Sequence, residues 1–311
     1  MSLAARRSLL SLAASALLVL SLALPGIAKA TFPGAPGLVV FNLTTYQPGN
    51  VVTGGLYAIQ PGEEQPRRLT SNPYDLDPSF APSGKELVFD RINTAEDGIY
   101  TLDLASGQTE RITARVSDHE PSFGPRGMIV FSRRFDDSLY DLVLRTGNGR
   151  LRRLTSTSER DSAPIFTPDG KRIVFSRRSR GPGHRERLYS IRLDGSKLRA
   201  LHALPREAYS FDLSPNGRRL ALGVFTDESS ERTTSAAWTM RLDGSGLDVA
   251  ADNAFWPTYS PTGTVLAYTN DKGLWQRAAD GHGAPTLIYA AEHPHPYEGS
   301  LATYPAWQPL P

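Results

Sequence analysis

The sequence predicts an all-β fold, a six-bladed β-propeller whose blades are four-stranded antiparallel sheets. The first observation is a seven-residue pattern, in which a short apolar strand is followed by a Pro-x-Gly turn, that occurs six times, the last copy without its glycine. The turn prolines are Pro82, Pro125, Pro168, Pro215, Pro261 and Pro309. The second observation is their spacing of 43, 43, 47, 46 and 48 residues. Periods of roughly 40–45 residues with several short strands are typical of propeller blades.

Each copy predicts the same strand–turn–strand unit. A short strand ends in an aromatic residue such as Phe80, and the turn that contains Pro82 and Gly84 leads into a second strand at 86–89. Proline presets φ at the first turn position, and glycine tolerates the positive φ that closes the turn. We expect the recurring aromatics to pack between blades, because their spacing follows the repeat. These aromatics are Phe80, Phe123, Phe166, Tyr259 and Trp307.

The repeats also predict how the ring closes. Strands at 38–41, 55–59 and 66–70 make only three strands at the start, one fewer than a blade needs. Five complete blades follow between residues 74 and 289, and 303–307 supply one last strand. We therefore expect the C-terminal strand to complete the N-terminal blade. Such a latch removes the open sheet edge that a linear stack of blades would expose.

Residues 1–30 are predicted to be an export signal. Arg6 and Arg7 form a positively charged start, 9–24 an apolar core, and 28–30 (Ala-Lys-Ala) a cleavage site. We expect cleavage after Ala30, a propeller domain at 31–311, and a periplasmic or secreted protein. An uncleaved membrane anchor is the alternative interpretation, and both the Sec and the twin-arginine route stay open.

Composition limits the classes of partner. Without residues 1–30 the chain has 31 Lys and Arg against 32 Asp and Glu, a formal charge of −1. A nearly neutral chain is a poor candidate for bulk binding to nucleic acid or to a membrane surface. The chain has no cysteine, which excludes disulfides, redox thiols and thiolate metal sites. About 280 residues suffice for one closed domain with a large core.

Two motifs of the repeat resemble a known family. The sequence RLT at 68–70 precedes DPSFAPSGKELVF at 77–89, and RLT at 153–155 precedes PIFTPDGKRIVFS at 164–176. This pattern resembles that of the TolB-type, WD-repeat-like propellers over essentially all of 38–309. The resemblance implies a six-bladed propeller built around interaction surfaces. No α/β domain like that of TolB precedes the repeats, so the Tol–Pal role is not implied, and the serine peptidase domain carried by some related propellers is missing.

The sequence offers little catalytic chemistry. It has no G-x-S-x-G elbow, no phosphate-binding loop and no calcium loop. His293 and His295 could offer two imidazoles to a metal, and some lyases resembling this family use histidine–metal sites. A plain polar loop is the favoured interpretation. The alternative function is therefore a metal-assisted lyase or hydrolase acting on a carbohydrate-like substrate, whereas the favoured one is a binding or scaffold module with no catalytic residues and no cofactor.

The predicted binding face is the end of the propeller where the inner strands begin. It carries the long loops at 44–53, 179–186, 226–235 and 291–301, and long loops on a rigid scaffold are where recognition usually occurs. The candidate residues are Asp75, Asp77, Asp118, His119, Glu120, Arg133, Arg134, Glu159, Asp161, Arg177, Arg178 and Tyr209.

The partner expected on this face is a protein, a peptide or a glycan. The arginines either bind an acidic partner or lie on solvated strands, and reversing Arg177 and Arg178 to Glu is expected to weaken binding. We expect no nucleic acid, no stable membrane insertion after signal cleavage, and a monomer.

Overall fold

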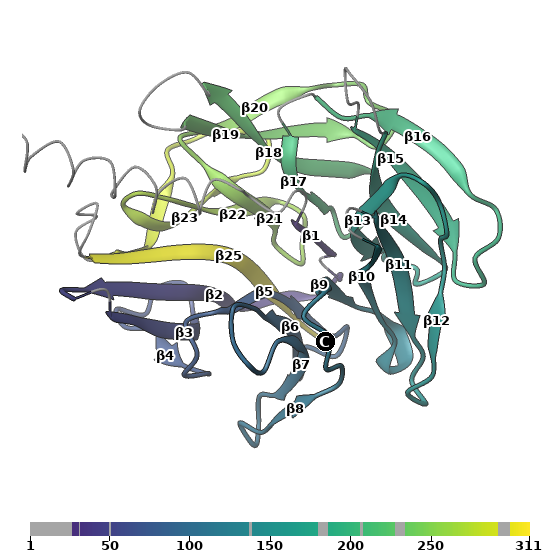
Figure 1. The fold of residues 1–311 in the computed structure, drawn as a ribbon. Coiled ribbons are helices and arrows are strands. Elements are labelled where there is room, and N and C mark those ends of the chain that lie inside the picture. Colours follow the sequence, from purple (N-terminus) through teal and green to yellow (C-terminus); the bar gives the residue numbers. More distant parts are fainter. Residues whose placement is uncertain are drawn as a thin grey trace, which may run out of the picture.

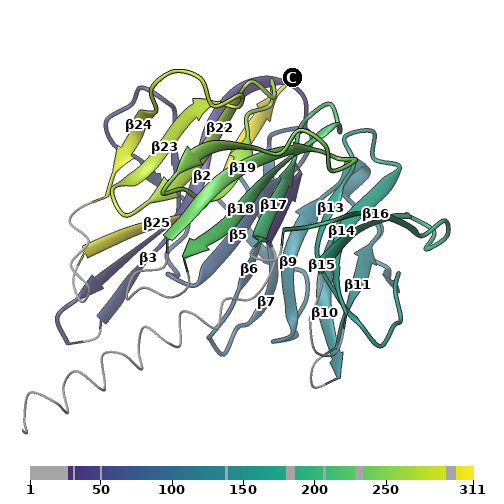
Figure 2. The same cartoon turned by 90° about the horizontal axis from the view of Figure 1, so that it is seen from above.

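The computed structural model describes residues 27–30, 32–49, 51–136, 139–179, 186–205, 208–227, 234–291 and 299–311. Within these residues six antiparallel sheets are arranged around a common axis (Figures 1 and 2). Five of the sheets have four strands. The sixth sheet, which forms blade 5, has a further strand, β1 (Ile27–Ala30), at its inner edge. The predicted six-bladed propeller of four-stranded blades is confirmed.

The strands of each blade follow one another from the axis outwards. Blade 1 consists of β25 (Gly299–Leu310), β2 (Ala35–Gln47), β3 (Val51–Ile59) and β4 (Arg67–Arg68). Blade 2 consists of β5 (Asp75–Phe80), β6 (Glu86–Arg91), β7 (Gly98–Asp103) and β8 (Thr109–Arg111). Blade 3 consists of β9 (Asp118–Phe123), β10 (Ile129–Asp136), β11 (Leu139–Arg145) and β12 (Leu151–Arg153), with the short helix η1 (Pro125–Gly127) between its first two strands.

The second half of the ring repeats this order. Blade 4 consists of β13 (Arg160–Phe166), β14 (Arg172–Arg178), β15 (Glu186–Arg192) and β16 (Arg199–Ala203). Blade 5 consists of β17 (Ala208–Leu213), β18 (Arg219–Asp227), β19 (Thr234–Arg241) and β20 (Asp248–Asp252). Blade 6 consists of β21 (Phe255–Tyr259), β22 (Val265–Asn270), β23 (Gly273–Ala278) and β24 (Thr286–Ala290).

The predicted latch is confirmed. The C-terminal strand β25 pairs antiparallel with β2, with Trp307 opposite Val39, and Figure 1 shows the yellow strand beside the purple one. Trp307 is 5% exposed and packs in a cluster with Phe41 and Ile59. One expectation about blade 1 is wrong. Most of the predicted loop at 44–53 is strand, because its β-branched and aromatic residues extend β2 and β3 into a long hairpin.

The core lies between blades, as the recurring aromatics predict. Phe80 and Phe89 of blade 2, for example, pack against Val40 and Leu56 of blade 1. The repeat glycines fit closely at these junctions. Gly84 has φ +67°, and a Cβ there would lie 2.1 Å from the backbone oxygen of Pro309. Glycine is therefore required at this turn both for its backbone conformation and for the approach of β25.

The RLT motifs form the outer corners of the blades. The Thr70 hydroxyl accepts a hydrogen bond from the Leu56 N–H at 3.0 Å, and the Arg68 Nε donates to the Thr70 carbonyl at 2.8 Å. The same bonds recur at 111–113 in blade 2 and at 153–155 in blade 3. The motif that carries the family resemblance is thus a structural one, which satisfies backbone groups that the short outer strands leave unpaired.

A short strand from the N-terminal region enters the ring. β1 (Ile27–Ala30) pairs in parallel with β17, Ile27 opposite Ser210 and Ala30 opposite Leu213, and it also contacts the inner strands β5, β9 and β13. Figure 1 shows it near the axis. The predicted cleavage after Ala30 would remove this strand from the mature protein. Among the described residues no helix has the length and apolarity to span a membrane.

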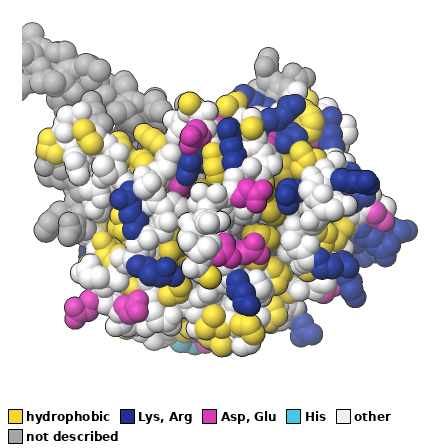
Figure 3. Space-filling view, turned by 90° about the horizontal axis from the view of Figure 1, so that it is seen from below, with side chains coloured by type: hydrophobic (Ala, Val, Ile, Leu, Met, Phe, Trp, Pro, Cys, Tyr) yellow, Lys and Arg dark blue, Asp and Glu magenta, His cyan; other side chains and the backbone are white. Residues whose placement is uncertain are grey.

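The propeller has two distinct ends and an uneven charge. We call the end where inner strands begin and second strands finish the loop end, and the end with the Pro-x-Gly turns the turn end. Residues 114–199, essentially blades 3 and 4, contain 19 Lys and Arg against 10 Asp and Glu. Lys and Arg are accordingly densest on the right-hand side of Figure 3, the side on which Figure 1 places these blades.

Candidate binding site

A bulge recurs in the inner strands at the residue before an internal proline. Five such residues have positive φ, and all precede a proline: they are Asp77 (51°), Glu120 (57°), Ala163 (52°), Trp256 (50°) and Tyr304 (53°). Proline cannot donate to the sheet ladder, so the pairing register shifts there. In blade 5 the equivalent Ser210 precedes Phe211 and has no positive φ. The backbone is therefore nearly constant at this position, while its side chain varies.

We call these six equivalent residues the axial ring. Asp77, Glu120 and Ala163 come from blades 2, 3 and 4, whereas Ser210, Trp256 and Tyr304 come from blades 5, 6 and 1. Neighbouring members contact each other or each other's strands, which places them near the axis. The Glu120 carboxylate, for example, accepts a hydrogen bond from the Ala163 N–H at 2.7 Å, and the rings of Trp256 and Tyr304 lie 4.7 Å apart.

One half of the axial ring is acidic. Asp77 is 7% exposed and Glu120 is 3% exposed, and Asp90 of β6 lies behind them with its carboxylate 3.3 Å from the Glu120 N–H. The His119 Nδ1 is 3.6 Å from the same carboxylate. Three buried carboxyl groups are thus concentrated on the inner edges of blades 2 and 3.

Burial changes the titration of this half. Desolvation raises the pKa of Glu120 to about 7, although Arg160, the Ala163 N–H and the Ser132 hydroxyl each act to lower it. Burial alone would lower the pKa of His119, but the nearby carboxylates, Asp90 first among them, outweigh it, so the pKa is raised. Glu120 therefore changes charge near neutral pH, which makes the electrostatic field at this end of the axis dependent on pH.

The opposite half of the ring has two aromatic members, Trp256 and Tyr304, and Tyr209 packs beside them. Tyr209 stacks on Phe225 at 4.2 Å between ring centroids, and its hydroxyl shares a 2.8 Å hydrogen bond with the Ser235 hydroxyl. Trp256 meets Tyr209 edge-on at 6.3 Å and Tyr304 at 4.7 Å. Trp256 and Tyr304 remain partly exposed, whereas Tyr209 is 9% exposed and largely part of the core.

Tyr304 joins the two halves. Burial raises the pKa of its hydroxyl well above the ordinary value, and the charges of Asp77 and Asp90 add to that effect. Tyr304 of blade 1 therefore lies between the carboxyl groups of blade 2 and Trp256 of blade 6. The site thus presents aromatic faces beside buried carboxyls, a combination that can recognise a ligand with both apolar and polar groups.

Five of the predicted binding-face charges, together with Arg91, form three ion pairs. In each of blades 2, 3 and 4 the aspartate that begins or nearly begins the inner strand lies opposite an arginine near the end of the second strand. The pairs are Asp75–Arg91, Asp118–Arg133 and Asp161–Arg177, with closest distances of 2.6, 2.6 and 2.5 Å. Each is bidentate. These arginines stabilise the blade, because each donates hydrogen bonds to both oxygens of a buried carboxylate.

This pairing changes the test expected for Arg177 and Arg178. Arg177 is 7% exposed and also lies 3.5 Å from Glu159, so a glutamate there would put like charges together in the core. Reversal of Arg177 would therefore unfold blade 4 rather than report on binding. Arg178 is partly exposed and pairs with Glu186 at 3.3 Å. Arg134 is exposed and is the better probe of the loop end.

The repeat contains signals for residues that the sequence prediction missed. Trp256 and Tyr304 occupy the same position as Asp77 and Glu120, immediately before the internal proline, so an alignment of the six copies would have found them. Arg91 follows Asp75 by 16 residues, as Arg177 follows Asp161, and Arg133 follows Asp118 by 15. This recurring spacing is the signal of the ion pairs. The binding role of the predicted face as a whole stays a prediction.

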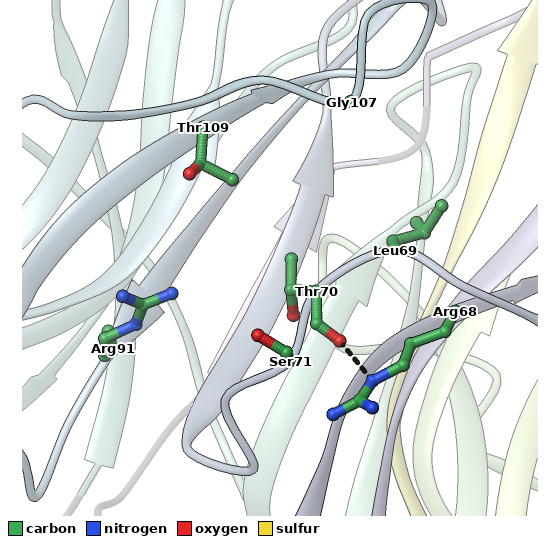
Figure 4. A pocket seen from close by; sticks show the side chains of 7 residues that line it. All are labelled: Arg68, Leu69, Thr70, Ser71, Arg91, Gly107 and Thr109. Carbon is green, nitrogen blue, oxygen red and sulfur yellow. Dashed lines mark hydrogen bonds between the residues drawn. The ribbon is translucent and has the colours of Figure 1, made fainter.

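A polar hollow lies away from the axis, between the outer parts of blades 1 and 2 (Figure 4). Its volume is about 360 Å³, and it is lined by Arg68, Leu69, Thr70, Ser71, Arg91, Gly107 and Thr109. Both guanidinium groups already have internal partners, since Arg68 donates to the Thr70 carbonyl and Arg91 binds Asp75. The hollow is therefore part of the corner structure and adds no charge that is available to a ligand.

Metal binding finds no support in the part of the chain that is described. No group of three or more His, Asp or Glu there could hold a metal ion. His293 and His295 lie outside the described residues, as do most of the predicted loops at 179–186, 226–235 and 291–301. The histidine–metal alternative is therefore untested by the geometry.

Comparisons with known proteins agree on the fold. No protein-family model matches the chain, and no curated protein matches it in sequence. The structure is similar to TolB from Acinetobacter baumannii, with a TM-score of 0.68 and 22% identity over 88% of this chain and 67% of that one.

Two other solved structures share the architecture. A chain in a nidogen/laminin complex matches with a TM-score of 0.56 and 14% identity over 85% of this chain and 97% of that one. An oligogalacturonate lyase in complex with manganese matches with a TM-score of 0.50 and 14% identity over 81% of this chain and 73% of that one. One architecture thus occurs in proteins of different kinds, so these similarities establish the fold alone. In fold, the chain is a TolB-like six-bladed β-propeller.

Proposed function

We propose that this protein is an exported binding module that holds a protein, peptide or glycan partner at its loop end. The observation that carries the proposal is the axial ring, in which the backbone is nearly constant and the side chains are specialised. The fold alone needs no tryptophan at position 256, since alanine fills the same place in blade 4. Partly exposed Trp and Tyr beside buried carboxyls are the residue types that dominate binding energy in recognition sites.

Location is part of the proposal. The positive start at Arg6 and Arg7, the apolar stretch at 9–24 and the Ala-Lys-Ala site at 28–30 support export to the periplasm or to the outside of the cell. Intact mass of the protein from its native host tests this, since the expected chain begins at Thr31. A chain that retains its N-terminus in the membrane fraction would contradict it.

The binding proposal is tested with defined ligand libraries. The purified chain is probed with a displayed random-peptide library and with a glycan array, and the selected ligands are measured by calorimetry. Trp256→Ala and Tyr304→Ala are each expected to lower affinity at least about tenfold, as hot-spot aromatics do. Trp275→Ala is the matched control, because Trp275 is also partly exposed but lies on the third strand of blade 6.

Either of two results contradicts the proposal. If selected ligands bind the Trp256, Tyr304 and Trp275 variants equally well, recognition lies elsewhere on the molecule. A chain that is folded, as shown by a cooperative thermal transition, and that selects no ligand from either library is not a binding module for peptides or glycans.

A further inference from the structure

The excess positive charge of blades 3 and 4 is concentrated at the turn end. Nine basic residues lie there, on the turns and at the adjacent strand ends, and we call them the basic turn-end surface. They are Arg126, Arg145, Arg150, Arg152, Lys171, Arg172, Arg192, Lys197 and Arg199. Seven are exposed, and Arg145 and Arg172 are partly buried. Within the described residues none of the nine forms an ion pair.

Among the described residues, the two acids on the turns of blade 4 form no ion pair with these basic residues. Asp169 accepts hydrogen bonds from the Thr167 hydroxyl at 2.6 Å and from the Lys171 N–H at 3.1 Å. Asp194 accepts from the Ser196 N–H at 2.9 Å. Both carboxylates therefore stabilise the turns that contain them.

Blade 4 brings three of its arginines together. Arg172 lies directly opposite Arg192 on the neighbouring strand, and like charges in that relation destabilise a sheet. The Arg172 guanidinium is held in place by the Ser190 and Lys197 carbonyls, at 3.0 and 2.6 Å. Burial, then the charges of Arg199 and Arg192, lower the pKa of Arg172. The charge of Asp169 opposes this only in part, so the fold tolerates a cationic cluster whose repulsion a bound anion would relieve.

Exposed leucines accompany this charge. Leu151 and Leu198 occupy equivalent places at the start of the outer region of blades 3 and 4, and they are 46% and 45% exposed. Leu151 stands between Arg150 and Arg152, and Leu198 between Lys197 and Arg199. The charges alone would hold an acidic soluble partner, whereas leucines flanked by cations can also enter the interfacial layer of a membrane while the cations contact anionic headgroups.

We propose that the basic turn-end surface docks reversibly on an anionic phospholipid surface, with its guanidinium groups against headgroup phosphates and Leu151 and Leu198 in the interfacial layer. This contact is separate from the loop-end site, so both can operate at once. The near-neutral net charge of residues 31–311 would argue against a membrane contact only if the charged residues were spread evenly over the surface. Here residues 114–199 are strongly basic and the remainder of the chain after residue 30 is acidic.

The test measures co-sedimentation of the purified chain with vesicles of phosphatidylglycerol and phosphatidylcholine, and with vesicles of phosphatidylcholine alone. All variants are made in one background, so that the apolar segment at 9–24 contributes equally. We expect binding to the anionic vesicles that weakens with added salt. The double variant Arg192→Glu, Arg199→Glu is expected to lower the bound fraction at least about tenfold, since each basic residue near such a surface contributes roughly fivefold.

Two further variants separate the mechanisms. The pair Arg134→Glu, Lys272→Glu changes the net charge by the same amount at exposed positions on the loop end, and it should lose much less binding. The pair Leu151→Ser, Leu198→Ser should lower binding a few-fold while leaving the salt dependence unchanged. Thermal unfolding of each variant shows whether it is folded.

The proposal fails on any of three results. Equal binding to neutral and anionic vesicles, or equal losses in the two charge-reversed pairs, would show that this surface is not the contact. Binding of soluble polyglutamate with no effect of the leucine variants would instead identify an acidic soluble partner.

Discussion

The two ends of blades 3 and 4 use the same residue type in opposite ways. At the loop end Arg133 and Arg177 are buried and bind aspartates in bidentate pairs. At the turn end Arg192 and Arg199 are exposed, and no ion pair forms with either among the residues described. The loop-end pairs are thus part of the scaffold, and the turn-end arginines remain available to an external anion.

The comparison shows why a count of arginines predicts function poorly. A buried guanidinium whose carboxylate is removed leaves an unpaired charge in the core, so its first effect is on stability. An exposed guanidinium with no carboxylate partner contributes little to stability, so its first effect is on contacts with other molecules. Which of the two applies to a given arginine depends on the residue opposite it in the sheet.

The largest expected effect is on stability, and it comes from removing the C-terminal strand β25 of blade 1. Deleting residues 303–311 removes most of β25, which opens the ring and exposes the inner edge of β2. We expect loss of the cooperative thermal transition. Trp307→Ala is the milder form and should cost about 3–5 kcal/mol, the range for a large buried aromatic. A deletion variant that melts within a degree of the parent would show that the latch does not hold the ring together.

The comparison between the ends is tested directly by two aspartates of blade 4. Asp161→Ala leaves Arg177 buried without its carboxylate and should cost about 3–5 kcal/mol of unfolding free energy. Asp194→Ala at the turn end removes only an exposed turn contact and should leave the urea midpoint nearly unchanged. Urea denaturation of both variants measures this. Similar midpoints for the two would mean that the loop-end pairs are not structural.

A pH effect is expected at the loop end. The pKa of Glu120 is about 7 in the folded protein, whereas the ordinary value is 4.5. Between these values the folded state binds a proton that the unfolded state releases, so stability falls as the pH rises from about 5 to 8. His119, whose pKa is also raised, acts in the same direction.

Glu120→Gln isolates the contribution of this carboxyl group. The amide keeps an oxygen for the Ala163 N–H and the Ser132 hydroxyl, but it does not titrate. The variant should therefore show a flatter dependence of thermal midpoint on pH over the same range. Parallel pH profiles for the variant and the parent would show that Glu120 titrates at an ordinary value.

The smallest effect is expected at the exposed rim of the loop end. Arg134→Glu changes one solvated charge and should alter the association rate of a loop-end ligand a few-fold, with little change in dissociation. Lys85→Glu, an exposed charge on the turn end of blade 2, is the matched control and should leave that rate unchanged. Stopped-flow measurements on a ligand selected by the loop end distinguish the two, and equal rates for both variants would remove Arg134 from the site.

The sequence by itself determined the architecture of this protein. The period of the turn prolines, the Pro-x-Gly signals and the imbalance between a three-strand start and a one-strand end are local features, so they predict six blades and the latch without knowledge of any contact. The loop expected at 44–53 is the exception, because hairpin length depends on β-branched residues that extend pairing past the expected end.

Only the tertiary structure decided which side chains meet. Asp161 and Arg177 are 16 residues apart and become one ion pair through the register of two strands, while Asp77 and Tyr304 become neighbours because the ring closes. Whether a charge is buried with a partner or exposed without one depends on such non-local contacts. For that reason the sequence predicted polar residues at the loop end, but not which of them stabilise the blades.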